Sequence, residues 1–391
     1  MDQEHDETRE QEQPRISTLR RWYGTVAVVF LNTCVAVLVG LVLMAVVANT
    51  FERKRVYSSR FIPASYELST LEEIRRIGQE YDQMGSQASY SYNPWTTFIE
   101  RPFRGDLLNI EAVQSYPTRA TIHRPPPATS ATGREDLLVW TFGGSTMMGW
   151  GVSDQHTVAS NLQHELQNAL PDKRIRVVNH GHAHYFSPQE VALYIALLRK
   201  DPPPDIVVFL DGLNDVARIG VGIEEPFFAP QATAGWEAER RRRYHPSSAS
   251  WFSLNANFPL YRVLRRLERK DVDHDTKEQT KHLERDEAVR RIVEVMRINR
   301  TVASSVSKAL GIQAFFFLQP LSRHSRKQPI FTPAYAALHR STRRHADFFD
   351  ISAPLEQELD HPYVDVTHYS DKGSLVVAQR IARVILQSSS P

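Results

Sequence analysis

The sequence predicts an α/β domain with a central, mostly parallel sheet, preceded by one membrane-spanning helix. Two observations lead to this prediction. From residue 137 onward, short apolar runs alternate with longer stretches of helical periodicity, and a long uncharged apolar segment lies near the N-terminus. The chain has 391 residues, of which 41% are hydrophobic and 24% charged, so there is enough apolar material for a substantial core.

The uncharged apolar segment covers residues 24–48. A helix of about 25 residues, rising 1.5 Å per residue, spans the hydrocarbon core of a bilayer. Trp22 and Tyr23 lie at its edge, where aromatic rings favour the membrane interface. We therefore expect a single-pass anchor. A cleaved signal peptide is the alternative, because residues 46–48 resemble a small-residue cleavage site. The basic residues on the two sides are too evenly balanced to predict an orientation.

The remaining sequence divides into three parts around this anchor. Residues 1–20 are acidic and glutamine-rich, so we expect a disordered tail. Residues 50–135 carry aromatics and prolines without clean periodicity, which indicates a membrane-proximal segment that packs on the main domain at 136–391. Residues 220–285 form an insertion in that domain and include four consecutive arginines at 240–243. Such a charge run is usually a solvated face, and contact with an anionic lipid or an acidic polymer is the alternative.

The alternation of strands and helices places three polar positions at one edge of the predicted sheet. The expected strands are 137–142, 176–179, 205–210, 312–318 and 348–351, and the expected helices lie near 157–169, 188–199, 286–310, 332–346 and 370–386. This order implies a parallel sheet covered on both faces. Sites in such sheets lie beyond the carboxyl ends of the strands. Ser145, Gly181 and Asn214 each follow one of the expected strands.

Ser145 has the sequence context of a nucleophile. It follows Gly143 and Gly144 at an expected strand-to-helix turn, where a hydroxyl would be accessible to a reacting group. A serine hydroxyl is a weak nucleophile and needs a base within hydrogen-bond reach. His368 can be this base, and Asp365, three residues earlier, can orient the imidazole and stabilise its protonated form. Taken singly, each motif also fits an ordinary turn or helix cap.

Other kinds of site are disfavoured. The alternating histidines at 180, 182 and 184 could array imidazoles toward a metal, but they follow a strand, so we expect a loop and no metal site. No phosphate-binding glycine loop is present, and we expect no cofactor. Cys34 is the single cysteine, which excludes a disulfide within the chain. The net charge of +2 argues against a nucleic-acid partner. The serine also lacks the glycine two positions later that a lipase-type nucleophile elbow uses.

Four blocks in this order resemble the SGNH (GDSL-type) hydrolase superfamily. They are Phe142-Gly143-Gly144-Ser145-Thr146, Asn179-His180-Gly181, Gly212-Leu213-Asn214-Asp215 and Asp365-Val366-Thr367-His368. The resemblance covers roughly residues 137–386 and is greatest to a membrane-anchored bacterial branch with a Gly-Gly-Ser-Thr first block. It implies a three-layer α/β/α, flavodoxin-like domain. One difference is that Gly144 takes the place of the aspartate in the superfamily's commonest first block.

The resemblance also implies an oxyanion hole. Its donors would be the backbone N–H groups of Ser145 and Gly181 and the side-chain amide of Asn214. Glycine at position 181 would keep a Cβ from crowding the substrate.

The function that follows is a membrane-anchored serine esterase. It would hydrolyse oxygen esters, which we expect to be O-acyl groups on a carbohydrate, through an acyl-serine intermediate. The resemblance places this domain on the extracytoplasmic, periplasmic side of a bacterial inner membrane. Two alternatives remain open: an O-acyltransferase that modifies a cell-surface or exported polysaccharide, and a catalytically silent module that binds polysaccharide or acts as a scaffold. The oligomeric state is not predicted.

Overall fold

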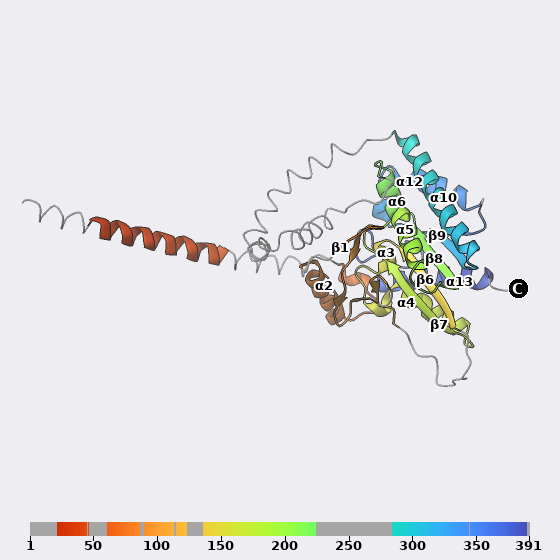
Figure 1. Ribbon diagram of the computed structural model, residues 1–391, viewed down its shortest axis with the longest axis horizontal. Helices are drawn as coiled ribbons and strands as arrows, with labels where there is room; N and C mark the ends of the chain where they lie inside the picture. The colour runs from red at the N-terminus through yellow and green to blue at the C-terminus, as the bar shows by residue number, and fades with distance from the viewer. Residues whose placement is uncertain are drawn as a thin grey trace, which may run out of the picture. The chain divides into compact units, whose positions relative to one another are not determined.

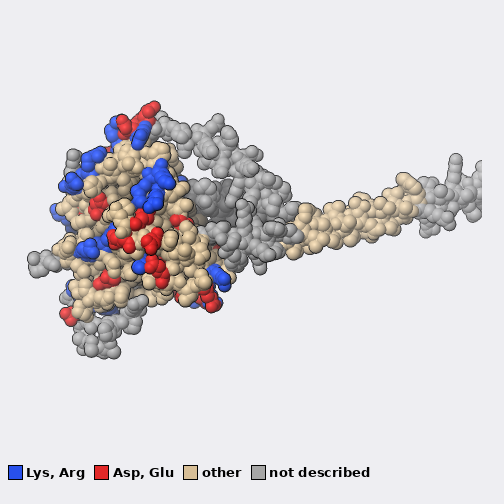
Figure 2. All heavy atoms as spheres, turned by 180° about the vertical axis from the view of Figure 1, so that it is seen from behind, with Lys and Arg blue, Asp and Glu red and all other residues tan. Residues whose placement is uncertain are grey.

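The computed structural model describes residues 22–44, 46, 61–86, 90–112, 115–122, 136–223, 284–343 and 345–388. The predicted tail at 1–20 and nearly all of the predicted insertion at 220–285 lie outside these residues. The chain divides into two units. The first includes the helix Trp22–Met44, which has 23 residues and a mean hydropathy of 2.7. This helix carries no charged side chain (Figure 2). Its length and composition fit a membrane span and equally a signal sequence.

The second unit is built on an eight-stranded, mostly parallel sheet (Figure 1). Its strand order is β10-β9-β8-β6-β7-β5-β4-β3. The five parallel strands are β6 (Asp136–Gly143), β7 (Arg174–Gly181), β8 (Ile206–Asp211), β9 (Gln313–Leu318) and β10 (Phe348–Asp350). Numbered along the chain, these five lie in the order 2-1-3-4-5, which is the flavodoxin-like arrangement. The predicted α/β fold with a central parallel sheet is therefore confirmed.

Helices cover both faces of the sheet and give each face its own core. Along β6, Trp140 and Phe142 point into one core and Val139 into the other, as the two-residue period of a strand requires. The first core is closed by α5 (Ser187–Leu198), α6 (Leu213–Ile219), α10 (Arg285–Ala309) and α12 (Phe331–Thr342). The second is closed by α4 (Val158–Ala169) and α13 (Asp371–Ser388). Among the described residues of this unit, the other helices of four or more residues are α2 (Leu71–Ser86), α3 (Ser145–Met148) and α11 (Arg323–Arg326).

Residues from the predicted membrane-proximal segment extend the sheet. Three short antiparallel strands, β3 (Phe103–Arg104), β4 (Asn109–Glu111) and β5 (Thr118–Arg119), form one edge beside β7. A separate hairpin consists of β1 (Tyr90–Asn93) and β2 (Thr97–Glu100). Since β5 pairs with β7, the described residues of this segment belong to the same fold as the predicted main domain.

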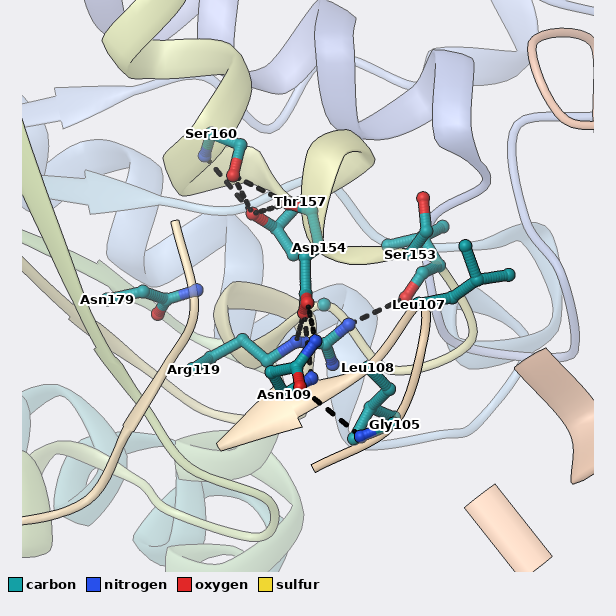
Figure 3. Close-up of polar contacts among 12 residues, drawn as sticks. Gly105, Leu107, Leu108, Asn109, Arg119, Ser153, Asp154, Thr157, Ser160 and Asn179 are labelled. Atoms are coloured by element: carbon teal, nitrogen blue, oxygen red, sulfur yellow. Dashed lines mark hydrogen bonds and ion pairs between the residues drawn. The ribbon is translucent and has the colours of Figure 1, made fainter. Parts of the chain in front are cut away.

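A buried polar network ties this edge to the loop that follows α3 (Figure 3). The Arg119 guanidinium donates to Asp154 Oδ1 at 2.6 Å and to the Val152 carbonyl at 2.9 Å. Asn109 Nδ2 donates to the other oxygen of Asp154 at 2.7 Å, and Tyr81 of α2 contacts the guanidinium through its hydroxyl at 3.1 Å. Arg119 is 2% exposed and Asp154 is 4% exposed, so removal of either partner would leave a buried charge without compensation.

Candidate active site

Ser145 is positioned by a strand-to-helix turn at the carboxyl end of β6. The strand ends at Gly143, Gly144 is extended, and Ser145 is the first residue of α3. Gly144 is required by its neighbours, because a Cβ there would overlap Asn214 Nδ2 and lie 2.9 Å from the Tyr185 carbonyl oxygen. The absence of a side chain at this position lets the Asn214 amide reach the residue next to the serine.

His368 and Asp365 complete a hydrogen-bonded chain that ends at Ser145. The loop that carries them is closed by a 2.8 Å bond from the Val364 N–H to the His368 carbonyl. Asp365 Oδ1 accepts the backbone N–H groups of Thr367 and His368, each at 2.8 Å. Asp365 Oδ2 lies 2.7 Å from His368 Nδ1, and His368 Nε2 lies 2.8 Å from Ser145 Oγ. The structure therefore brings together the three residues predicted to form a triad.

The charge of Asp365 determines which nitrogen of His368 carries the proton. Burial raises the pKa of this carboxyl, but the hydrogen bonds and charge of His368, with the Thr367 N–H, outweigh burial and lower the pKa overall. Asp365 is therefore ionised at neutral pH and accepts the Nδ1–H of His368. The lone pair of Nε2 then faces the Ser145 hydroxyl, which is the arrangement a general base needs.

Asn214 places an amide beside the nucleophile. Its Nδ2 donates to the Tyr185 carbonyl at 2.7 Å, which uses one of the two amide hydrogens. The start of α6 is held by Asp215, whose carboxylate accepts the Gly212 N–H at 3.2 Å and the Ser187 N–H at 3.0 Å. Ser145, at the start of α3, adds a backbone N–H that has no partner within its own helix. The Ser145 N–H and the second amide hydrogen of Asn214 remain the predicted oxyanion donors.

Gly181 does not fit the predicted role. Its N–H donates to Asn179 Oδ1 at 2.9 Å, so this donor is already engaged. A Cβ at this position would overlap the Met148 nitrogen and lie 2.7 Å from the Met147 carbonyl carbon. The glycine is therefore needed for close packing of β7 under α3, and not to leave room for a substrate.

The three alternating histidines occupy three different environments. His180 is fully buried, with its ring 5.1 Å from that of Phe142 and 5.3 Å from that of Trp140, and burial lowers its pKa well below the usual range. His182 contacts Glu100 of β2 through Nδ1. His184 is partly exposed and has a positive φ of 69°. This separation explains why the repeat does not present three imidazoles to one point.

Two residues to which no role in the site was assigned from the sequence, Gln319 and Trp150, lie close to it. Gln319, which follows β9, accepts the Thr146 hydroxyl at 2.9 Å and the Tyr369 hydroxyl at 3.2 Å through its Oε1 atom. It thereby links the residue after the nucleophile to the residue after His368. The Trp150 ring lies 5.9 Å from the His368 ring. In the sequence, only its position directly after the expected strand 312–318 indicated that Gln319 lies at the edge of the sheet that holds the site.

A buried carboxyl pair lies under the start of α6. Burial and the nearby Asp215 raise the pKa of Asp211 to about 7, and burial together with Asp211 raises that of Glu190 well above its usual range. Two such carboxyls in contact hold at least one proton at neutral pH. Asp211 directly precedes Gly212, the N-cap of the helix that carries Asn214.

Comparisons with known proteins yield similar structures but no matching sequence family. No family model matches the chain, and no curated protein matches it. An acetylxylan esterase from Geobacillus stearothermophilus, solved as a catalytic mutant, is 15% identical, with a TM-score of 0.37 over 65% of this chain and 96% of that one. A psychrotrophic esterase from a Pseudoalteromonas species is 14% identical, with a TM-score of 0.36 over 64% and 97%.

A third similar structure, from Desulfitobacterium hafniense, is described as a lipolytic protein of the G-D-S-L family. It is 10% identical, with a TM-score of 0.36 over 63% of this chain and 98% of that one. All three are similar to the chain at low sequence identity, so the function proposed below rests on the geometry of the site.

Proposed function

We propose that the protein is a serine esterase that hydrolyses oxygen esters through an acyl-serine intermediate. The observation that carries this proposal is the unbroken chain from Asp365 through His368 to Ser145, with spacings of 2.7 and 2.8 Å. A surface serine has no need of a base that is itself oriented by a partly buried carboxylate. This arrangement is the one that activates a hydroxyl.

The residues divide the reaction into two steps. In the first, His368 Nε2 takes the Ser145 proton while Oγ bonds to the ester carbon, and the carbonyl oxygen becomes an oxyanion. The tetrahedral species collapses when the ester C–O bond breaks, and His368 protonates the leaving alcohol. In the second step, water gives a proton to His368 and attacks the acyl-serine, and Ser145 recovers its proton as the acid leaves.

The oxyanion forms beside the Asn214 amide and the Ser145 N–H. Fixed donors at this point stabilise the transition state more than the ground state, because the negative charge exists only after attack. The Asn214 amide is held in advance by the Tyr185 carbonyl, so it does not need to reorganise during the reaction.

We also propose that residues 24–48 anchor the protein in a membrane, with the esterase domain on the extracytoplasmic side. The uncharged helix Trp22–Met44 and the resemblance of the four sequence blocks support this placement. The same resemblance favours O-acyl groups on a carbohydrate as the substrates.

Hydrolysis of simple esters tests the proposed chemistry. The full-length protein in detergent should release p-nitrophenol from p-nitrophenyl acetate, and Ser145→Ala should reduce this release to the uncatalysed rate. Circular dichroism should show the same fold in both proteins. Equal rates in the two proteins, or no release from a folded wild type, would refute the proposal.

A further inference from the structure

Glu100 lies outside all four sequence blocks, and the role that we assign to it rests on the proposed esterase function. Glu100 is the last residue of β2 and is 1% exposed. Both of its carboxylate oxygens contact the loop that follows β7. Oε1 accepts the Ala183 N–H at 2.6 Å, and Oε2 contacts His182 Nδ1. A buried carboxylate is unfavourable unless such bonds satisfy it, so the contacts are specific.

The loop that Glu100 holds is a tight turn over residues 182–185. The Tyr185 N–H bonds to the His182 carbonyl at 3.3 Å, and His184, at the third position, has a φ of 69°. Positive φ at this position, without positive φ at Ala183, defines a type II turn. Glycine is the usual residue there, and a residue with a Cβ adopts this conformation less readily.

Three of the four N–H groups in this turn have protein acceptors. His182 donates to the Gly143 carbonyl at 3.0 Å, Ala183 donates to Glu100, and Tyr185 donates to His182. Among the described residues, none accepts the N–H of His184. The next residue, Tyr185, receives the Asn214 amide at 2.7 Å on its carbonyl, so the turn passes directly beside the proposed oxyanion donors.

We propose that Glu100 is a positioning residue, which fixes the 182–185 turn so that the His184 N–H faces the oxyanion. This donor takes the role that was predicted for Gly181, whose N–H is engaged by Asn179. In a type II turn the peptide between the second and third residues has the opposite orientation to that in a type I turn. The bond from Ala183 to Glu100 and the positive φ of His184 together set the direction of that peptide.

The hairpin that carries Glu100 is itself hydrogen-bonded to Tyr185 of this turn and to Gln189 of α5. The Tyr185 hydroxyl donates to the Phe98 carbonyl and contacts Thr96 Oγ1 at 2.7 Å, and Gln189 Nε2 donates to the Thr96 carbonyl at 2.9 Å. All of these hydrogen-bonding groups belong to residues that are 2% exposed or less. The carboxylate is therefore presented from a fixed hairpin, as a positioning role requires.

The test compares Glu100→Gln with a matched control, Glu80→Gln, in the full-length protein. Glu80 is also a buried carboxylate from the N-terminal segment, 5% exposed, and it accepts the N–H groups of Asp106 at 2.9 Å and Leu108 at 2.8 Å. It has no contact with the turn. A glutamine at position 100 can offer its oxygen to Ala183 or to His182, but not to both.

The expected result for Glu100→Gln is a loss of about 10- to 100-fold in kcat on p-nitrophenyl acetate, with KM changed by less than about threefold. A boronic acid that forms a tetrahedral adduct on Ser145 should bind more weakly by a similar factor. Glu80→Gln should keep kcat within about threefold of the wild type per folded molecule, even if its melting temperature falls as far as that of Glu100→Gln. Equal kcat in the two variants would overturn the inference, because Glu100 would then be only structural.

Hydrogen–deuterium exchange supplies a readout that does not depend on ester hydrolysis. Glu100→Gln should speed exchange of the amides at 183–185, and Glu80→Gln should instead speed exchange at 106–108. Unchanged exchange at 183–185 would overturn the role of Glu100 whatever the activity. A folded wild type without esterase activity would count against the proposed function and leave the exchange test valid.

Discussion

Replacement of Asp365 by asparagine separates the charge of this side chain from its hydrogen bonds to the loop. In the wild type, Oδ1 accepts two backbone N–H groups at 2.8 Å, and Oδ2 faces His368 Nδ1 at 2.7 Å. In Asp365→Asn, the amide oxygen must stay at the Oδ1 position, because an NH₂ group there would face two donors. The NH₂ group therefore faces His368 Nδ1.

This orientation forces the wrong tautomer on His368. With a donor facing Nδ1, the ring keeps its proton on Nε2 and cannot accept the Ser145 proton. A change of this kind in a Ser-His-Asp triad lowers turnover by about 10⁴, which corresponds to about 5.5 kcal/mol of transition-state stabilisation. We expect a loss of this size in kcat, and little change in KM, because the carboxylate does not touch the substrate.

The stability of the same variant should depend on pH in a defined direction. The pKa of Asp365 in the folded protein is lowered, so its stabilising contribution is complete above the unfolded value of about 3.9 and is lost as the pH falls through the folded value. Asp365→Asn removes this contribution. The variant should be less stable than the wild type by about 1–2 kcal/mol at pH 7, and the difference should shrink below about pH 4.

Steady-state kinetics and urea unfolding of the same preparations measure both effects. Asp365→Ala is the matched control, because it also removes the bonds to Thr367 and His368 and should be the less stable variant of the two. Activity in Asp365→Asn within about tenfold of the wild type would contradict this prediction. It would mean that His368 receives its orientation from a group other than this carboxylate.

Two further predictions concern the glycine beside the nucleophile and the apolar helix. Gly144→Ala should lower kcat by about 10- to 100-fold, with a smaller effect on stability, because the new Cβ displaces the Asn214 amide. Steady-state kinetics and thermal unfolding of the variant measure the two effects. An unchanged kcat would contradict the prediction. A cytoplasm-only fluorescent reporter fused to the C-terminus should stay dark, and an alkaline phosphatase fusion should be active, if the domain is extracytoplasmic. The reverse pattern would contradict the proposed topology.

The predictable parts of the fold are those whose strands and helices leave long apolar patterns in the sequence. Parallel strands of six to eight residues, such as β6 and β8, are continuous apolar runs, and their carboxyl ends share one edge of the sheet. This is why Ser145 and Asn214 could be placed together from the sequence. Asp365 and His368 were recognisable because an acid and an imidazole three residues apart can bond to each other within one short loop.

The parts that were not predictable depend on contacts without periodicity. The edge strands β3, β4 and β5 have only two or three residues each, which is too short for an alternating pattern. The engagement of the Gly181 N–H depends on the Asn179 side chain two residues earlier, which a motif does not reveal. Glu100 bonds to the Ala183 N–H and to the His182 side chain, which are 83 and 82 residues away in the chain, and contacts at such a separation have no signature in the sequence.

Covalent labelling determines whether Ser145 is an activated nucleophile. A fluorophosphonate probe reacts with activated serine hydroxyls, and peptide mass spectrometry locates the adduct. We predict that the wild type carries the label on Ser145, that Ser145→Ala carries none, and that His368→Ala reacts far more slowly. A folded wild type that stays unlabelled, or that carries the label on another serine, would show that Ser145 is not the activated nucleophile.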